Sequence, residues 1–134
     1  SDIATYARVD NPTYRLLKAN TPGAYTFILN ASKELPKLLK QDKRKTIGVR
    51  IPSHPIPLAI LETLEMPMLT VSLVLPEEDL PPADIEEVEQ ALLERVDLIV
   101  DGGACGIEGT SVIDLTGSAP EVVREGVGDI HPFI

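Results

Sequence analysis

The chain has 134 residues and a mass of 14.5 kDa, the size of one compact domain or a large piece of one. Its composition, 43% hydrophobic and 25% charged, excludes a wholly disordered chain and a fibrous repeat. No stretch approaches the roughly 18 apolar residues of a membrane helix, and the first residues lack the regions of a signal peptide. We therefore expect a cytoplasmic protein. Since the sequence does not begin with Met, we also expect an N-terminal stretch to have been removed.

The net charge of −9 is unevenly distributed along the chain. Residues 31–50 contain seven basic and two acidic residues, whereas residues 77–101 contain ten acidic residues and a single arginine. An acidic average repels polyanions, so any nucleic-acid binding has to come from the basic segment. The single cysteine, Cys105, excludes an internal disulfide, and the two histidines, His54 and His131, form no zinc-ligand pattern. The sequence therefore predicts no metal site.

Proline, glycine and hydrophobic patterns divide the first half of the chain into helices and strands. An Asn-Pro pair predicts a helix over residues 11–19, which the Thr-Pro-Gly at 21–23 ends. Two runs rich in β-forming residues predict strands at 24–29 and 47–51. A Ser-His-Pro sequence repeats the capping pattern, and the apolar spacing after it predicts a helix over residues 56–64.

The second half of the chain continues the alternation. Residues 68–75 are nearly uncharged and predict a central strand buried on both faces. Asp84 followed by Glu87 is a variant of the capping box, and predicts a helix with an apolar side that extends to Val96. Three further short strands are predicted at residues 97–100, 111–115 and 122–124. Because strands and helices interleave, we expect an α/β or α+β fold around a mixed sheet.

The glycine-rich loop 102–109 and its cysteine each have two interpretations. Glycines let backbone N–H groups approach an anion closely, which favours phosphate binding. The loop lacks the spacing of a P-loop and leads into a strand, so a structural turn is the alternative. Cys105 is a candidate nucleophile or, since no histidine is paired with it in the sequence, a small packed thiol.

Two arginines and three hydroxyl residues indicate a ligand pocket. Arg50 ends a predicted strand ahead of a helix N-terminus, where its guanidinium group suits a carboxylate or phosphate. Arg124 allows the same interpretation, and a strand-end ion pair is the alternative for both. Thr70 and Ser72 alternate along their predicted strand, so their hydroxyls share a face, and Thr110 adds a third. Together these residues predict a pocket for a small ligand with anionic and hydroxyl groups.

Four motifs in order resemble those of the YrdC-like superfamily. Pro-Gly-x-x-Thr lies at residues 22–26, Val-Arg-x-Pro-x-His-Pro at 49–55, Thr-Ser-Val-Ile-Asp at 110–114 and Arg-x-Gly at 124–126. The resemblance runs over nearly the whole chain. Lys-Arg-Lys-Thr-Ile-Gly and Thr-Val-Ser-Leu-Val-Leu-Pro, at 43–48 and 70–76, are most similar to the YciO branch of that superfamily.

This resemblance implies an α/β (α+β) fold with a twisted open mixed sheet, helices and a basic concave surface. It also implies an L-threonylcarbamoyladenylate synthase, which joins threonine, bicarbonate and ATP, releases pyrophosphate, and supplies the t6A modification of tRNA. The implied contacts are threonine or its carbamate for Arg50, Thr70 and Thr110, and the nucleotide for Thr46, Ser72 and Arg124. Magnesium would arrive with ATP, held largely by the phosphates, and no tightly bound cofactor is expected.

The sequence departs from the synthase pattern in two places. Leu73-Val74 replaces the Ala-Asn of the synthases, a change that the YciO branch shares. The family begins with a Pro-Thr-(Glu/Asp)-Thr strand and a Lys-x-Arg motif, and this chain starts after both. We therefore expect one YrdC-like domain over residues 1–134 that is incomplete at its N-terminus and is inactive alone. The exposed sheet edge left by the missing strand predicts either association, for example as a homodimer, or disorder.

Two alternative functions remain open. The first is a non-catalytic protein of the same fold that binds tRNA, rRNA or other double-stranded RNA, with an affinity that falls steeply with salt. Its surface would consist of Lys37, Lys40, Lys43, Arg44 and Lys45. Val74 and the absent Lys-x-Arg motif favour this function, whereas the net charge of −9 opposes it. The second is a carbamoyl-transfer enzyme or hydrolase that uses carbamoyl phosphate.

Overall fold

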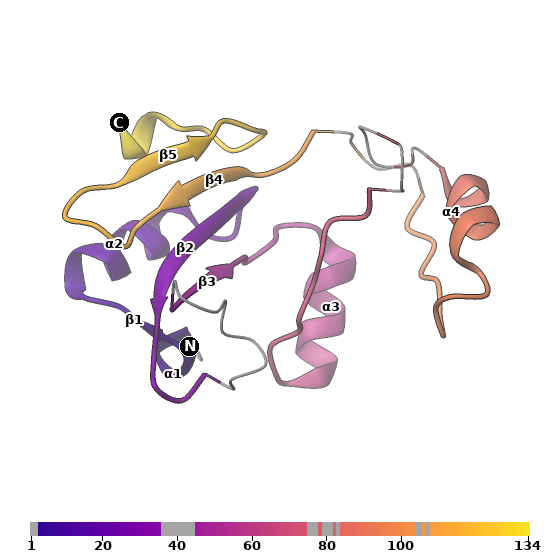
Figure 1. The fold of residues 1–134 in the computed structure, drawn as a ribbon, viewed down its shortest axis with the longest axis horizontal. Coiled ribbons are helices and arrows are strands. Elements are labelled where there is room, and N and C mark those ends of the chain that lie inside the picture. Colours follow the sequence, from indigo (N-terminus) through magenta and orange to yellow (C-terminus); the bar gives the residue numbers. More distant parts are fainter. Residues whose placement is uncertain are drawn as a thin grey trace.

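The fold is built around a five-stranded mixed sheet (Figure 1). The computed structural model describes residues 3–35, 45–74, 78, 82, 84–103, 106 and 108–134. The strands are β1 (Ala7–Arg8), β2 (Tyr25–Ala31), β3 (Thr46–Val49), β4 (Ser111–Asp114) and β5 (Glu121–Arg124). They lie in the order β1-β2-β4-β5, and β3 pairs with β2 off this path. The pairs are antiparallel except for β2 and β4, which are parallel. The predicted mixed sheet is confirmed.

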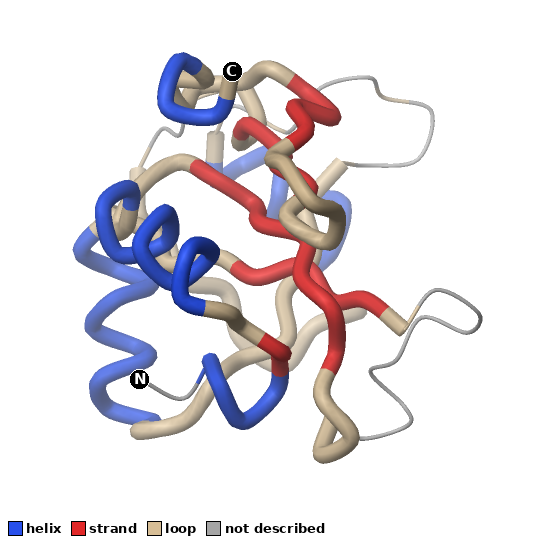
Figure 2. The backbone as a smooth tube through the Cα atoms, turned by 90° about the vertical axis from the view of Figure 1, so that its left-hand side faces the viewer, coloured by secondary structure: helices blue, strands red, loops and turns tan. Residues whose placement is uncertain are grey.

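The helices are α1 (Ile3–Tyr6), α2 (Asn11–Asn20), α3 (Pro55–Leu64), α4 (Ile85–Leu92) and a C-terminal 3₁₀ helix, η2 (His131–Phe133). Helix α2 lies against the sheet (Figures 1 and 2), whereas α4 lies at the opposite end of the molecule (Figure 1). The predicted helix after Asp84 ends at Leu92 and is shorter than expected. No helix in the described part of the chain is long and apolar enough to cross a bilayer.

Side-chain caps fix the starts of the three longer helices. Asp10 caps α2, where its Oδ1 accepts a hydrogen bond from the Thr13 N–H at 2.9 Å. His54 caps α3 through Nδ1, which accepts from the Ile56 N–H at 3.1 Å. Both α2 and α3 carry proline in the first turn, as the sequence predicts. Asp84 caps α4 by accepting from the backbone N–H three residues later, which confirms the predicted helix start.

The core lies on one face of β2. Alternate residues of this strand are buried, as the period-two pattern of a half-buried strand requires. The buried core residues come from β1, α2, β2, β4 with the residue after it, and η2: Ala7, Leu17, Tyr25, Phe27, Leu29, Ile113, Leu115 and Phe133. The Phe133 ring packs at centroid distances of 5.4 Å from Tyr25 and 5.8 Å from Phe27. The C-terminal end of the chain is therefore anchored in the centre of the core.

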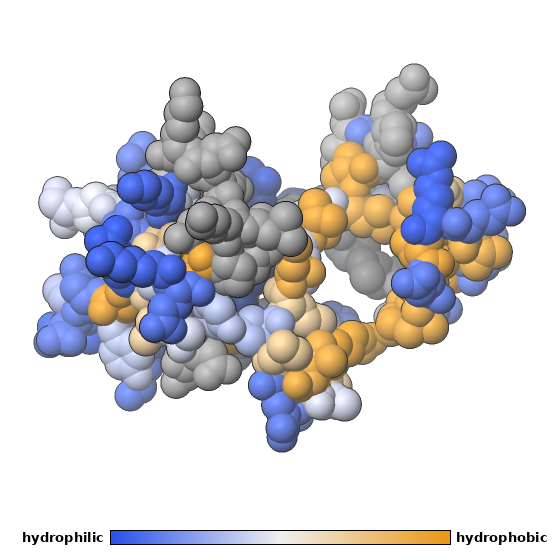
Figure 3. Space-filling view, turned by 60° about the horizontal axis from the view of Figure 1, so that its bottom comes forward, coloured by the Kyte–Doolittle hydropathy of each residue, from blue (hydrophilic) through white to orange (hydrophobic). Residues whose placement is uncertain are grey.

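The predicted buried strand at 68–75 is wrong. Residues 68–74 form no strand, and Leu69 and Val71 are 81% and 92% exposed. An apolar run indicates that a segment suits a buried strand, but it does not supply a neighbouring strand, and no described strand pairs with this one. The predicted strand at 97–100 is wrong for the same reason, and Leu98 is 80% exposed. Apolar side chains therefore gather on the surface at the α4 end of the molecule (Figure 3).

Candidate functional site

The register of the sheet places Thr26, Arg50 and Thr110 on the face opposite the core. Thr26 alternates with the buried Tyr25 and Phe27, so its side chain points away from the core. Phe27 pairs with Val49, the last residue of β3. Arg50 is the next residue, so its side chain lies on the opposite face from Val49, which is the face of Thr26. Tyr25 pairs with Ser111 at the start of β4, so Thr110, one residue earlier, also shares the face of Thr26.

A β-bulge brings Arg124 to the same face. Ile113 pairs with Val122, but the preceding residue, Val112, pairs with Arg124, so Val123 is the extra residue of the bulge. Val122 packs against the core. Regular alternation would turn Arg124 to the same side as Val122, and the extra residue reverses this direction.

Hydrogen bonds join five residues across this face into what we call the polar chain: Ser72, Arg50, Thr26, Thr110 and Arg124. Arg50 Nε donates to Thr26 Oγ1 at 2.8 Å, and Arg50 Nη2 reaches Ser72 Oγ at 3.4 Å. The hydroxyls of Thr26 and Thr110 are 2.7 Å apart. Arg124 donates from Nε and Nη2 to the Thr110 carbonyl oxygen at 3.0 and 2.7 Å, and from Nη2 to Thr110 Oγ1 at 3.3 Å. Both arginines are exposed and both threonines are half-buried.

The polar chain is rich in hydrogen-bond donors. Each threonine hydroxyl accepts an N–H from a guanidinium group, and the bond between the two hydroxyls uses only one of their two protons. One O–H therefore remains for a further acceptor. Neither Arg50 nor Arg124 forms an ion pair with a described carboxylate, so the alternative of a strand-end ion pair is not realised among these residues. Such a set of donors suits the oxygens of a carboxylate or a phosphate.

Two glycines allow the close packing that holds Arg124 in place. A Cβ atom on Gly109 would lie 3.0 Å from Arg124 Nη2, so the guanidinium group lies directly over this glycine. A Cβ atom on Gly126 would lie 2.5 Å from the Thr110 carbonyl oxygen, the atom that Arg124 binds. The segment after β5 thus passes against the start of β4 at a distance that only glycine permits.

The other two predicted substrate residues, Thr46 and Thr70, form no described hydrogen bond with the polar chain. Thr46 begins β3 and pairs with Asn30, four residues before Arg50, which corresponds to ~13 Å along a strand. Thr70 is exposed two residues before Ser72, and in the described part of the chain its hydroxyl makes no hydrogen bond to the polar chain. Their predicted roles stay predictions.

The predicted basic surface is largely outside the described residues. Lys37, Lys40, Lys43 and Arg44 lie there, as does Cys105, and only Lys45 of the predicted RNA-binding set is described. Lys45 is exposed and has a positive φ of 52°. The RNA-binding prediction therefore stays a prediction.

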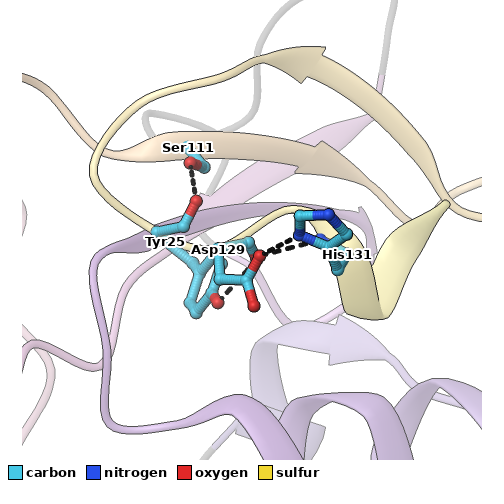
Figure 4. A network of polar contacts seen from close by, with 5 residues as sticks. Tyr25, Ser111, Asp129 and His131 are labelled. Atoms are coloured by element: carbon cyan, nitrogen blue, oxygen red, sulfur yellow. Dashed lines mark hydrogen bonds and ion pairs between the residues drawn. The ribbon is translucent and has the colours of Figure 1, made fainter.

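A second polar network holds the segment after β5 against β2 and β4 (Figure 4). The Tyr25 hydroxyl donates to the Asp129 carbonyl oxygen at 2.8 Å. The fully buried Ser111 donates from Oγ to the Gly128 carbonyl oxygen at 2.6 Å and accepts from the Gly126 N–H at 2.9 Å. The backbone N–H and ring Nδ1 of His131 lie 3.1 and 2.7 Å from Asp129 Oδ1. This network positions the glycine that packs beside Thr110.

We expect the Asp129→Asn variant to lower the pKa of His131 toward its ordinary value of 6.5. The Asp129 side chain raises the pKa of His131, first through their hydrogen bond and then through its charge. A raised pKa contributes stability that is fully present below pH 6.5 and is lost as the pH rises through the His131 pKa of the folded protein. The measurement is an NMR titration of the His131 ring.

The Glu125→Gln variant is the control for this titration. Glu125 is the last and smallest of the causes that raise the pKa of His131, so its replacement should shift the midpoint less than Asp129→Asn does. An unchanged His131 midpoint in the Asp129→Asn variant would show that the contact at 2.7 Å does not control this pKa.

Comparison with known proteins identifies the family of this chain. Residues 1–126 match the family model of Sua5, YciO and YrdC, which carries the description "Telomere recombination". The chain belongs to the Sua5/YciO/YrdC family. It is 54% identical to YciO of Escherichia coli K12 over its whole length, and 53% identical to a Haemophilus influenzae protein. The chain spans 65% of the length of these two relatives.

Solved structures of the Sua5/YciO/YrdC family confirm the fold. The crystal structure of Escherichia coli YciO has a TM-score of 0.92 over 99% of this chain and 65% of that chain. Pyrococcus abyssi Sua5 complexed with L-threonine has a TM-score of 0.79 at 26% identity, over 93% of this chain and 37% of that chain. The threonylcarbamoyl-AMP synthase of Pyrococcus abyssi is 32% identical over 83% of this chain and 32% of its own length. The predicted family and YrdC-like fold are thus confirmed.

Proposed function

We propose that the whole protein containing this chain is a threonylcarbamoyl-AMP synthase and that the polar chain is part of its substrate site. The observation that carries the proposal is the line from Arg50 through Thr26 and Thr110 to Arg124, which presents two guanidinium groups without described carboxylate partners on one face of the sheet. Matches in Pyrococcus abyssi support it: a relative there is named threonylcarbamoyl-AMP synthase, and Sua5 of the same organism was solved with L-threonine.

The proposed roles follow the chemistry of each group. Arg50, with Thr110 beside it, binds the carboxylate of L-threonine or of its carbamate, because a guanidinium group donates two hydrogen bonds to one carboxylate. Arg124 and Ser72 bind the nucleotide phosphates. The predicted contacts of Thr70 with threonine and of Thr46 with the nucleotide belong to the same proposal.

The proposed reaction balances without a redox step. The threonine amine and bicarbonate form a carbamate and water, and a carbamate oxygen then attacks the α-phosphorus of ATP, from which pyrophosphate leaves. The protein contributes by holding the anions together and by stabilising negative charge as the phosphorus–oxygen bonds change. The described residues contain no group of three histidine, cysteine or carboxylate side chains that fits a metal ion. We propose that magnesium comes as the ATP complex, bound mainly by phosphate oxygens.

The test is pyrophosphate release with L-threonine, bicarbonate, ATP and magnesium, measured on this chain and on the full product of its gene. We expect release from the full product only, because these 134 residues contain no Lys-x-Arg motif and span 65% of the length of the relatives. Release should require both threonine and bicarbonate, so reactions that lack either one are the controls. No release from the full product would contradict the proposal and favour RNA binding through the basic segment 33–50.

A further inference from the structure

The polar chain has one member without an assigned role in substrate binding. Thr26 lies in its middle, on β2, and its hydroxyl contacts both Arg50 and Thr110. We propose that Thr26 is a positioning residue, which holds the Arg50 guanidinium group and the Thr110 hydroxyl at the spacing that an anionic substrate needs. This inference rests on the proposed function.

The topology makes Thr26 the link between two parts of the site. Arg50 follows β3 and Thr110 precedes β4, and these two strands pair with opposite edges of β2. No described hydrogen bond joins Arg50 directly to Thr110. The spacing between the two substrate-binding groups is therefore set through the Thr26 hydroxyl, at 2.8 Å from Arg50 Nε and 2.7 Å from Thr110 Oγ1.

Thr26 lies half-buried in a packed strand, whereas Arg50 lies exposed on the surface. The neighbours of Thr26 in β2, Tyr25 and Phe27, are 8% and 1% exposed, and β2 is paired on both edges at this level. The branched side chain of threonine also restricts its own rotation. Arg50 is exposed, and its long side chain has many conformations in the absence of a partner. A hydrogen bond from Nε fixes the plane of the guanidinium group. It leaves Nη1, and the N–H of Nη2 that is not used for Ser72, to bind a ligand.

The Thr26 hydroxyl also controls the donors that the site offers. With both hydroxyls accepting from an arginine and bonded to each other, one O–H proton is left over. If Thr26 donates to Thr110, the free O–H is that of Thr110, beside the proposed threonine site. Removal of the Thr26 hydroxyl thus changes the positions of the Arg50 guanidinium group and the Thr110 hydroxyl, although neither Arg50 nor Thr110 is itself replaced.

The test is the Thr26→Val variant in the full product of the gene. Valine has the shape of threonine and suits a strand, so the melting temperature should stay within about 4 °C of the wild type. We expect the KM for L-threonine to rise about 10-fold to 100-fold, the scale for a lost hydrogen bond to a charged group, with a smaller change in the KM for ATP. The Thr26→Ser variant should restore the KM for L-threonine to within about threefold of the wild type.

Two controls separate positioning from general damage. Thr63→Val removes a threonine hydroxyl that bonds the Ala59 carbonyl oxygen in α3, away from the polar chain, and should change neither KM. In an Arg50→Ala background, Thr26→Val should raise the KM for L-threonine much less than in the wild type, because it acts largely through Arg50. Equal KM values for L-threonine in the wild type and in Thr26→Val would overturn the inference.

The inference also has a readout that does not depend on synthase activity. The NMR signal of the Arg50 Nε–H group should shift and exchange faster with water in Thr26→Val, because its acceptor is gone. An unchanged Nε–H signal would overturn the positioning role. The Arg50 Nε–H signal could shift in Thr26→Val while the wild type releases no pyrophosphate. That result would overturn the proposed function and leave the positioning role supported.

Discussion

Replacement of Arg50 or Arg124 by alanine is expected to lower kcat/KM for pyrophosphate release by about 100-fold to 1000-fold. In the proposed site each guanidinium group would supply charge-assisted hydrogen bonds to an anion, and loss of such a donor costs roughly 3 to 4 kcal/mol of transition-state stabilisation. The two variants should differ in which substrate's KM rises most. Arg50→Ala should raise the KM for L-threonine most, and Arg124→Ala should raise the KM for ATP most. Steady-state kinetics of the full gene product checks both.

Arg15→Ala is the matched control for these variants. Arg15 is exposed on α2 and is not part of the polar chain, so its loss removes the same charge without removing a substrate contact. Arg124→Lys adds a second comparison, because lysine cannot reproduce the two bonds that Nε and Nη2 make to the Thr110 carbonyl oxygen. Nucleotide affinity that is unchanged in both alanine variants would contradict the proposed site.

Gly126→Ala is expected to lower the free energy of unfolding by about 3 kcal/mol or more. The added methyl group would lie 2.5 Å from the Thr110 carbonyl oxygen and 2.6 Å from its carbonyl carbon. These are backbone atoms, so they can move only if the start of β4 shifts, and overpacking of this kind costs about 1–3 kcal/mol or more. Urea-induced unfolding of the wild type and the variant measures the difference.

Gly117→Ala is the control for this prediction. Gly117 lies between β4 and β5, and a Cβ atom there would have its nearest neighbour, the Ala119 carbonyl oxygen, at 3.9 Å. This substitution should change the unfolding free energy by less than about 1 kcal/mol. If Gly126→Ala proves as mild as Gly117→Ala, the close approach between Gly126 and Thr110 is not a constraint on the fold.

Local patterns in the sequence predicted most of the elements that form this sheet and its helices. The helix starts at Asp84 and near residues 11 and 55 depend on caps and prolines, which act within three residues of one another and are visible in the sequence. The segment 68–75 was predicted wrongly because its apolar character says nothing about a partner strand. Pairing between distant segments is the information that a hydrophobic pattern lacks.

The candidate site shows the same division between local and long-range information. Arg50, Ser72, Thr110 and Arg124 were predicted as ligand residues, and the structure brings them together. Thr26 ends the Pro-Gly-x-x-Thr motif, which does not predict its role, since its position between the other residues depends on the register of three strands. The direction of Arg124 depends on a bulge, which alternation along β5 does not reveal.

The hydrogen bond between Thr26 and Thr110 joins residues that are 84 positions apart in the sequence. The polar chain therefore exists only after β2 and β4 have paired, and the unfolded chain has no equivalent of it. A ligand that contacts both ends of the polar chain binds the folded state alone, so binding and folding are thermodynamically linked. At a ligand concentration 100 times its Kd, this linkage adds about 2.7 kcal/mol to the stability of the folded protein. The bound substrate would thus connect β2 and β3 to β4 and β5 reversibly, and so stabilise the pairing of β2 with β4.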